Sequence, residues 1–159
     1  MKILVASDTH GHSEPLNDLL YKYESEIEMV IHLGDFAEDI TMLSYAYSEL
    51  TFHAVAGAVC VNCEREKIIT VANRKILMLH GHLHGVKTGL DKLISYAAEE
   101  GVDICLFGHT HQQIMFEQDG ILFMNPGTIS DPRWPSNTCG YGILDITEDG
   151  VIKAEVFPL

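Results

Sequence analysis

The sequence is poor in positive charge. Its 159 residues include 10 Lys and Arg against 23 Asp and Glu, which gives a formal net charge of −13. A protein that binds long nucleic acid nonspecifically needs a basic surface to neutralise the phosphates, so this balance argues against that class of partner. Small anionic substrates remain open, provided that bound metal ions supply positive charge locally.

Long apolar runs are absent and cysteine is sparse. The N-terminal apolar run, Ile3–Ala6, is too short for the core of a signal peptide or for a membrane span, which needs about 20 apolar residues. We therefore expect a cytoplasmic protein with no membrane partner. The four cysteines, Cys60, Cys63, Cys105 and Cys139, are expected to be free thiols in a reducing compartment.

The overall composition is that of a folded globular chain. Apolar residues make up 47% of the sequence and charged residues 21%, which excludes a disordered chain. We find no internal repeat, low-complexity tract or linker, so we expect residues 1–159 to form a single domain.

Strand-like and helix-like segments alternate along the chain. Buried-strand patterns predict strands at Lys2–Ser7, Met29–Leu33, Phe52–Ala56, Lys67–Val71, Ile76–Leu79, Ile104–Phe107, Met115–Gln118, Ile121–Met124, Tyr141–Ile146 and Ile152–Phe157. Helical spacing of apolar residues predicts helices at Glu14–Tyr23, with Ser13 as N-cap, Ile40–Leu50 and Lys87–Glu100. Turn sequences at Asn73-Arg74, Asp119-Gly120 and Glu148-Asp149-Gly150 predict hairpins. Crossovers mixed with hairpins indicate an α/β fold with a layered, mixed sheet and helices outside.

Polar loops follow five of the predicted strands. Their sequences are Asp8-Thr9-His10, Gly34-Asp35, Gly57 with a Cys- and Asn-rich stretch, His80-Gly81-His82 and Gly108-His109-Thr110-His111. Because ligands gather at the carboxyl ends of strands in open α/β folds, these loops are expected to bring two Asp and five His to one edge. Glycines among them allow sharp turns and close backbone approach.

Carboxylate and imidazole donors in this arrangement indicate a metal site. They suit Mn, Fe, Zn, Co or Ni, and the near absence of sulfur argues against a structural zinc site. An Asp can bridge two cations about 3.5–4 Å apart, and such a pair assists in-line displacement at phosphorus. A hydroxide between the two ions is then the expected nucleophile. Each motif alone has an ordinary explanation, such as a helix N-cap or a turn, but paired histidines after buried strands serve no packing purpose.

Together with Asn125-Pro126-Gly127-Thr128, these motifs resemble the calcineurin-like metallophosphoesterase superfamily. The small size and the His-Gly-His form resemble its compact bacterial and archaeal phosphodiesterase branch, whose fold a retromer subunit shares. The resemblance extends from Met1 to about Ile146. It implies a β-sandwich of two mixed sheets flanked by helices, two divalent metal ions with Mn expected first (Ni, Fe, Co or Zn as alternatives), and a small phosphodiester or nucleotide-like substrate. A homo-oligomer is left open.

The resemblance also implies roles for individual residues. Asp8, His10 and His111 would hold one ion, Asp35 would bridge, and His80 and His109 would hold the second ion. His32 and His82 would support the site or contact phosphate, and Asn125–Thr128 would support it from a loop. Leaving-group protonation is assigned to His10, His82 or solvent, since histidine titrates near neutral pH. Arg133 is expected to contact a substrate phosphate, while Trp134 stacks on a substrate base or covers the core edge.

One position departs from the family pattern. Members usually carry a ligating Asn after the glycine of the third loop, where this sequence has Ala58, which has no donor atom. Three alternatives remain open: Asn62 replaces that ligand, the second ion has three protein ligands plus water, or the second site is impaired. The last alternative corresponds to a non-catalytic or weakly active scaffold protein on the same fold.

The spacing Cys60-Val61-Asn62-Cys63 also resembles a redox motif. A thiol oxidoreductase would need a helix that starts at the first cysteine, whereas the chain soon becomes strand-like at Lys67. We interpret the two cysteines as an incidental thiol pair, with a thiol oxidoreductase as a distant alternative.

Overall fold

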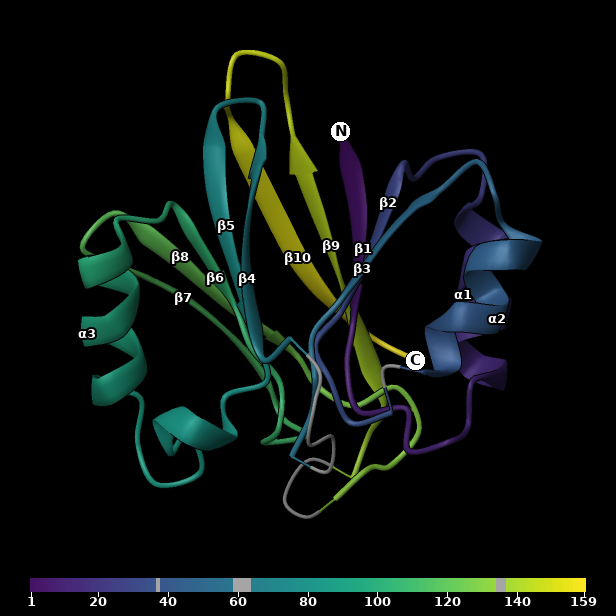
Figure 1. Ribbon diagram of the computed structural model, residues 1–159, viewed down its shortest axis with the longest axis horizontal. Helices are drawn as coiled ribbons and strands as arrows, with labels where there is room; N and C mark the ends of the chain where they lie inside the picture. Colours follow the sequence, from purple (N-terminus) through teal and green to yellow (C-terminus); the bar gives the residue numbers. More distant parts are fainter. Residues whose placement is uncertain (37, 59–63, 134–136) are drawn as a thin grey trace.

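Two five-stranded sheets lie face to face, with helices on their outer sides (Figure 1). This computed structural model describes residues 1–36, 38–58, 64–133 and 137–159. The predicted α/β sandwich of two mixed sheets flanked by helices is confirmed. Among the described residues, no helix combines the length and apolar character needed to cross a bilayer.

The first sheet has the strand order β10-β9-β1-β2-β3. Its strands are β1 (Lys2–Ala6), β2 (Met29–His32), β3 (Thr51–Ala54), β9 (Gly140–Ile146) and β10 (Ile152–Pro158). The helices α1 (Glu14–Tyr23) and α2 (Asp39–Ala46) connect β1, β2 and β3, which are parallel because each connection crosses the sheet. The hairpin β9–β10 adds an antiparallel edge beside β1.

The second sheet has the order β4-β5-β6-β8-β7. Its strands are β4 (Glu66–Val71), β5 (Arg74–Leu79), β6 (Ile104–Leu106), β7 (Gln113–Gln118) and β8 (Ile121–Pro126). The three central strands are parallel, and β4 and β7 are antiparallel edges. A short 3-10 helix, η1 (His82–His84), and α3 (Asp91–Glu100) connect β5 to β6.

Buried apolar side chains form three clusters, one between the two sheets and one on the outer side of each sheet. On β1, Ile3 and Val5 point into the core between the sheets, while Leu4 and Ala6 point outward to the layer beneath α1 and α2. Both sets are buried, so the sequence of this strand is a continuous apolar run, as expected of a central strand that is covered on both faces. A third apolar cluster lies between the second sheet and α3.

Several boundaries differ from the expectation. The helix predicted at Ile40–Leu50 ends at Ala46, because Tyr47 leaves the helical conformation with ψ 59°. The helix predicted at Lys87–Glu100 begins at Asp91, because Gly89 disfavours helix by about 1 kcal/mol relative to alanine. The hairpin turn expected at Asn73-Arg74 lies one residue earlier, where Ala72 and Asn73 both have positive φ, as a type I′ turn requires. Ser13 occupies the N-cap of α1, but its side chain makes no capping hydrogen bond.

Arg74 joins the two sheets at one end of the sandwich. Its Nε donates to the carbonyl of Gly150 at 2.8 Å, and its Nη1 donates to Asp103 Oδ1 at 2.9 Å. Gly150 belongs to the β9–β10 turn of the first sheet, whereas Arg74 begins β5 of the second. The carboxyl ends of the parallel strands therefore lie at the opposite end.

Candidate metal centre

The loops after β1, β2, β5 and β6 meet at the lower end of the sandwich in Figure 1. They bring six of the predicted ligands into two groups, which are Asp8, His10 and His111, and Asp35, His80 and His109. In each group the candidate donor atoms lie within 4.8 Å of one another. The structure thus assembles the residues expected to share an ion, and their binding of metal stays a prediction.

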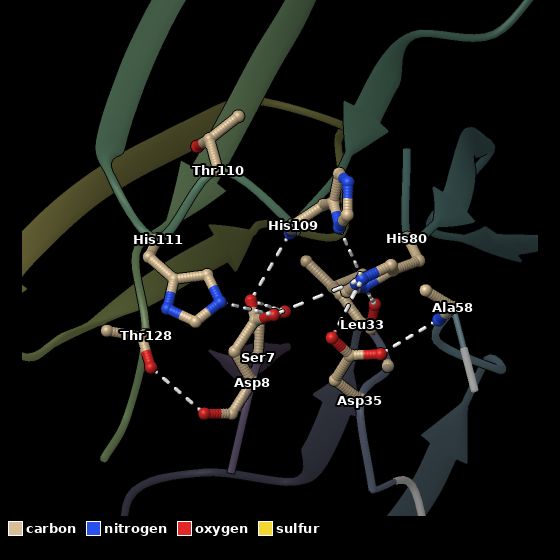
Figure 2. Close-up of polar contacts among 12 residues, drawn as sticks. Ser7, Asp8, Leu33, Asp35, Ala58, His80, His109, Thr110, His111 and Thr128 are labelled. Atoms are coloured by element: carbon tan, nitrogen blue, oxygen red, sulfur yellow. Dashed lines mark hydrogen bonds and ion pairs between the residues drawn. The ribbon is translucent and has the colours of Figure 1, made fainter. Parts of the chain in front are cut away.

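The two groups adjoin each other. His111 Nε2 lies 3.2 Å from Asp8 Oδ1, and His80 Nε2 lies 3.4 Å from Asp35 Oδ2. His80 Nε2 is also 4.0 Å from Asp8 Oδ1, and His10 Nε2 is 3.9 Å from Asp35 Oδ2. Figure 2 shows ring nitrogens of His111 and His80 directed at the carboxylates of Asp8 and Asp35, while the ring of His109 faces His80. The spacing suits a dinuclear site in which a carboxylate lies between the ions.

Each group combines residues from both sheets. Asp8 and His10 follow β1, and Asp35 follows β2, all in the first sheet. His80 follows β5, and His109 and His111 follow β6, in the second sheet. Neither group would exist if the two sheets were not packed in this register.

Hydrogen bonds fix how two of the imidazoles face the site. His80 Nδ1 donates to the carbonyl of Leu33 at 2.7 Å, and His111 Nδ1 donates to the carbonyl of Asp131 at 2.7 Å. A carbonyl oxygen only accepts, so Nδ1 carries a proton and Nε2 is the atom directed at the carboxylates, as a donor when the ring is cationic and as a ligand when a metal ion takes the place of that proton. This arrangement is typical of metal-ligating histidines.

Asp8 provides a test of whether a cation fits. Its side chain is fully buried, and Oδ2 accepts hydrogen bonds from Ser7 Oγ at 2.6 Å and from the backbone N–H of His109 at 3.2 Å. Its Oδ1 accepts no hydrogen bond of proper geometry from the described residues, although His111 Nε2 faces it. A buried acceptor opposite another acceptor needs a proton or a cation between them, so the residues present fit a bound metal ion.

The backbone of these loops is strained at the predicted ligands. Five of the six have positive φ without being glycine: Asp8 (57°), His10 (48°), Asp35 (51°), His109 (70°) and His111 (59°). Each such conformation costs about 1–3 kcal/mol and persists only where the surrounding structure imposes it. Strain of this kind is found at functional sites, which supports a function for this cluster.

The third loop approaches Asp35 through its backbone. Ala58 N–H donates to Asp35 Oδ1 at 2.8 Å, and Gly57 makes this approach feasible because a Cβ there would lie only 2.5 Å from Asp35 Cα. Ala58 therefore contributes a hydrogen-bond donor to the second group and no metal ligand. Asn62, the alternative ligand, lies outside the described residues, as do Cys60, Cys63 and Trp134.

The charges keep both carboxylates ionised. Burial raises the pKa of Asp8, but a hydrogen bond and charge from His111 outweigh it, so the pKa lies below its ordinary value. Burial likewise raises the pKa of Asp35, but its hydrogen bond with His80 and the charge of His80 outweigh burial, so this pKa is also lowered. Burial lowers the pKa values of His80 and His111. The contacts of these rings with Asp35 and Asp8 outweigh burial, so both pKa values lie above the ordinary one. Both carboxylates are thus available as ligands at neutral pH.

His82 lies beside the second group without belonging to it. Its ring centroid is 5.5 Å from that of His80 and 6.0 Å from that of His109. Its Nδ1 has no hydrogen-bond partner among the described residues. Burial and the charge of His80 lower its pKa. A role for His82 in protonating the leaving group stays a prediction, which its place beside the second group leaves open.

His32 is enclosed instead. It is 0% exposed, its Nδ1 accepts from the N–H of Gly34 at 3.3 Å, and its Nε2 lies 3.2 Å from Thr9 Oγ1. Burial lowers its pKa to about 4, so the ring is neutral. This geometry favours the expectation that His32 supports the site, because the ring orders the loop that carries Asp35, whereas a contact with substrate stays a prediction.

Side chains at the end of β8 and in the loop after it donate hydrogen bonds to the backbone of the loops that carry the candidate ligands. Asn125 Nδ2 donates to the carbonyl of Gly108 at 2.9 Å, and Thr128 Oγ1 donates to the carbonyl of Asp8 at 2.9 Å. Sequence reasoning missed two further hydroxyls, Ser7 on Asp8 and Ser130, whose Oγ donates to the carbonyl of Thr9 at 2.5 Å. Single serines beside a strand or loop carry no pattern that would have revealed them.

Arg133 stands on the rim of the site. Its Nε donates to Asp131 Oδ2 at 2.8 Å, and its side chain is 52% exposed. Asp131 in turn accepts from His111 through its backbone carbonyl, so Arg133 is held close to the first group. It lines a cavity of about 370 Å³ that His109 and His111 also line.

The fold is a two-sheet α/β sandwich with two adjoining Asp/His groups, each able to hold a metal ion, at its strand ends. Residues 1–149 match the calcineurin-like phosphoesterase superfamily domain, and the chain belongs to this family of metal-dependent phosphoesterases.

Three comparisons give the detail. The chain is 36% identical over 152 residues to the probable metallophosphoesterase YsnB of Bacillus subtilis, covering 94% of this chain and 86% of that protein. It is 28% identical over 173 residues to a phosphodiesterase of Methanocaldococcus jannaschii, covering 98% and 94%. Wild-type Vps29 of Entamoeba histolytica, solved in complex with Zn²⁺, superposes with a TM-score of 0.79 at 24% identity, covering 99% of both chains. This last likeness concerns the fold alone.

Proposed function

We propose that the protein is a phosphodiesterase that hydrolyses a small phosphodiester with two divalent metal ions. The observation that carries this is the pair of adjoining groups built around Asp8 and Asp35, one carboxylate and two imidazoles in each. The similarity to a phosphodiesterase of Methanocaldococcus jannaschii supports a diester substrate. Ions in these groups would polarise the phosphate oxygens and activate water at neutral pH.

The donor atoms of the two groups limit which metal ions are expected. Mixed carboxylate and imidazole donors suit Mn, Fe, Co, Ni and Zn, and we propose Mn as the first to test. Zinc stays among the alternatives because imidazole nitrogens and carboxylate oxygens both ligate it. Asp35 Oδ2 lies 3.4 Å from His80 Nε2 and 3.9 Å from His10 Nε2, so it is the carboxylate best placed to serve both groups.

The direct test is hydrolysis of bis(p-nitrophenyl) phosphate by protein stripped of metal and then given one divalent ion at a time. We expect turnover to depend on the added ion and to exceed that of p-nitrophenyl phosphate, the corresponding monoester. Failure of all five ions to restore turnover would contradict the proposal. A preference for the monoester would reassign the enzyme as a phosphomonoesterase.

We assign protonation of the leaving group to His82. His10 directs its Nε2 at both carboxylates, which commits that atom to the first group, whereas His82 belongs to neither group and its ring centroid lies 5.5 Å from that of His80. A positioned acid contributes about 100-fold or more, mainly to poor leaving groups. We therefore expect His82→Ala to lower kcat/KM about 100-fold for a dialkyl phosphodiester and much less for bis(p-nitrophenyl) phosphate.

The exposed His12 supplies the control for this assignment, because His12→Ala removes an imidazole from a nearby loop outside both groups. We expect it to change neither rate. Equal losses on both substrates in the His82 variant would show that His82 only supports the fold of the site.

A second candidate function rests on Ala58. A protein whose second ion binds weakly could act as a scaffold on the same fold, and Ala58 offers no side-chain donor beside Asp35, His80 and His109. Metal content and activity distinguish the two functions: two ions per chain with turnover favours the enzyme, while one ion without turnover favours the scaffold.

Ala58→Asn is expected to strengthen the second site. An amide oxygen beside Asp35 adds a ligand, and we expect the affinity for the second ion to rise at least about tenfold, since even outer partners of a metal change affinity 10- to 100-fold. Calorimetric titration of the stripped protein with Mn²⁺ measures this. Ala58→Leu adds a side chain of similar size without a donor and should give no gain; a gain in both variants would contradict the ligand explanation.

A further inference from the structure

A cavity of about 370 Å³ opens directly beside both candidate metal groups. It is bordered by His109 of one group and His111 of the other, so it touches the site on the side of the loop after β6. Thr110, between these histidines, also lines it and lies on the face of the loop away from Asp8 (Figure 2). Val86 and Ile114 give it an apolar portion.

Two of the chain's few cations line this cavity. Lys87 and Arg133 both border it, although the sequence holds only 10 Lys and Arg against 23 acidic residues. The guanidinium of Arg133 is held by Asp131 at 2.8 Å. Lys87 is exposed and forms no ion pair within the described ranges, so its ammonium is available to a ligand.

Lys87 and Arg133 lie beside the candidate metal groups. They line the same cavity as His109 of the second group and His111 of the first. Asp131, which holds Arg133 at 2.8 Å, also accepts a hydrogen bond from His111 through its backbone carbonyl. A ligand in the cavity would therefore extend from the reacting phosphate.

We propose that this cavity binds a second anionic group of the substrate, so that the preferred substrate is a phosphodiester carrying a further phosphate or carboxylate. Lys87 is the specificity-determining residue, because an ammonium is a strong point charge for a phosphate oxygen. The net charge of −13 would otherwise repel such a substrate. This inference rests on the proposed function, since the diester must lie at the metal groups.

A matched pair of substrates tests the inference. Thymidine 5′-(p-nitrophenyl phosphate) and the same compound with a 3′-phosphate differ only in the additional anion. We expect kcat/KM to be at least about tenfold higher for the 3′-phosphorylated compound, which corresponds to about 1.4 kcal/mol. The preference should weaken as salt is added, because screening reduces the attraction.

Variants of Lys87 locate the effect. Lys87→Gln is expected to reduce the ratio of the two kcat/KM values about tenfold, and Lys87→Glu to reverse the preference. Lys75→Gln makes the same change on an exposed lysine at the opposite end of β5 and should leave the ratio unchanged. An unaltered ratio in Lys87→Gln, or a wild-type ratio near one, would overturn the inference.

Binding gives a second measurement that needs no turnover. Calorimetry of the Mn²⁺-loaded protein should show tighter binding of thymidine 3′,5′-bisphosphate than of thymidine 5′-monophosphate, with the difference lost in Lys87→Gln. If neither nitrophenyl ester is hydrolysed but this difference is seen, the proposed function fails and the anion site stands. If both esters are hydrolysed at equal rates and the nucleotides bind equally, only the anion site fails.

Discussion

Asp8→Asn is expected to remove the first metal ion and with it nearly all phosphodiesterase activity. Asp8 Oδ1 is the buried acceptor that faces His111 Nε2 at 3.2 Å and His10 Nε2 at 3.9 Å. A neutral amide removes the negative charge that would offset the ion. Loss of an outer partner alone weakens metal binding 10- to 100-fold, so we expect a loss of more than about 100-fold in affinity here.

Metal analysis of the variant after dialysis against Mn²⁺, together with kcat/KM on bis(p-nitrophenyl) phosphate, measures the effect. Asp18→Asn makes the same chemical change on the exposed side of α1 and should retain both ions and full activity. Circular dichroism in a chelator separates loss of metal from loss of fold. Retention of two tightly bound ions by Asp8→Asn would show that the grouping in the structure is not the metal site.

Gly57→Ala is expected to destabilise the protein and to displace Asp35. The added methyl would lie 2.5 Å from Asp35 Cα and closer still to its backbone nitrogen and Oδ1, where no side-chain rotation can relieve the overlap. Overpacking against mobile side chains costs about 1–3 kcal/mol. Against backbone we expect the free energy of unfolding to fall by at least about 3 kcal/mol, together with weaker metal binding.

Urea unfolding in the presence of a chelator measures the stability change without the contribution of metal. Gly89→Ala is the matched control, because nothing lies within 4 Å of the added methyl and its φ is not in the left-handed region. That variant should be as stable as the wild type or more stable by up to about 1 kcal/mol. Equal stability of Gly57→Ala would mean that the third loop can withdraw from Asp35.

The sequence was most informative where a residue's chemistry and its position after a strand coincided. The helix at Glu14–Tyr23 matches the structure, because its apolar spacing and polar flanks agree. The grouping of Asp8 with His111 follows only with the family resemblance. The loops that carry these residues are far apart in the sequence: the hydrogen bond from His109 to Asp8 spans 101 residues. No local pattern encodes a contact of that range.

The sequence does not predict features that depend on contacts between distant parts of the chain. Leu50 continues the apolar spacing of α2 because it packs on the core, and this makes the helix look longer than it is. The sequence predicts a helix that starts at Lys87, whereas the structure puts this residue on the wall of a cavity that His109 also lines. The positive φ of Asp8 and His111 likewise reflects constraint from neighbouring loops, which a linear pattern does not contain.

Because each metal group takes residues from both sheets, bound ions would act as cross-links between the two halves of the sandwich. Arg74 already fastens the far end through Gly150 and Asp103. The end with the site, by contrast, holds two buried carboxylates, whose charge bound ions would offset, and loops with strained backbone. Binding of ions to the folded state shifts the folding equilibrium by mass action. Metal supply would thus set the stability of the folded protein as well as its activity.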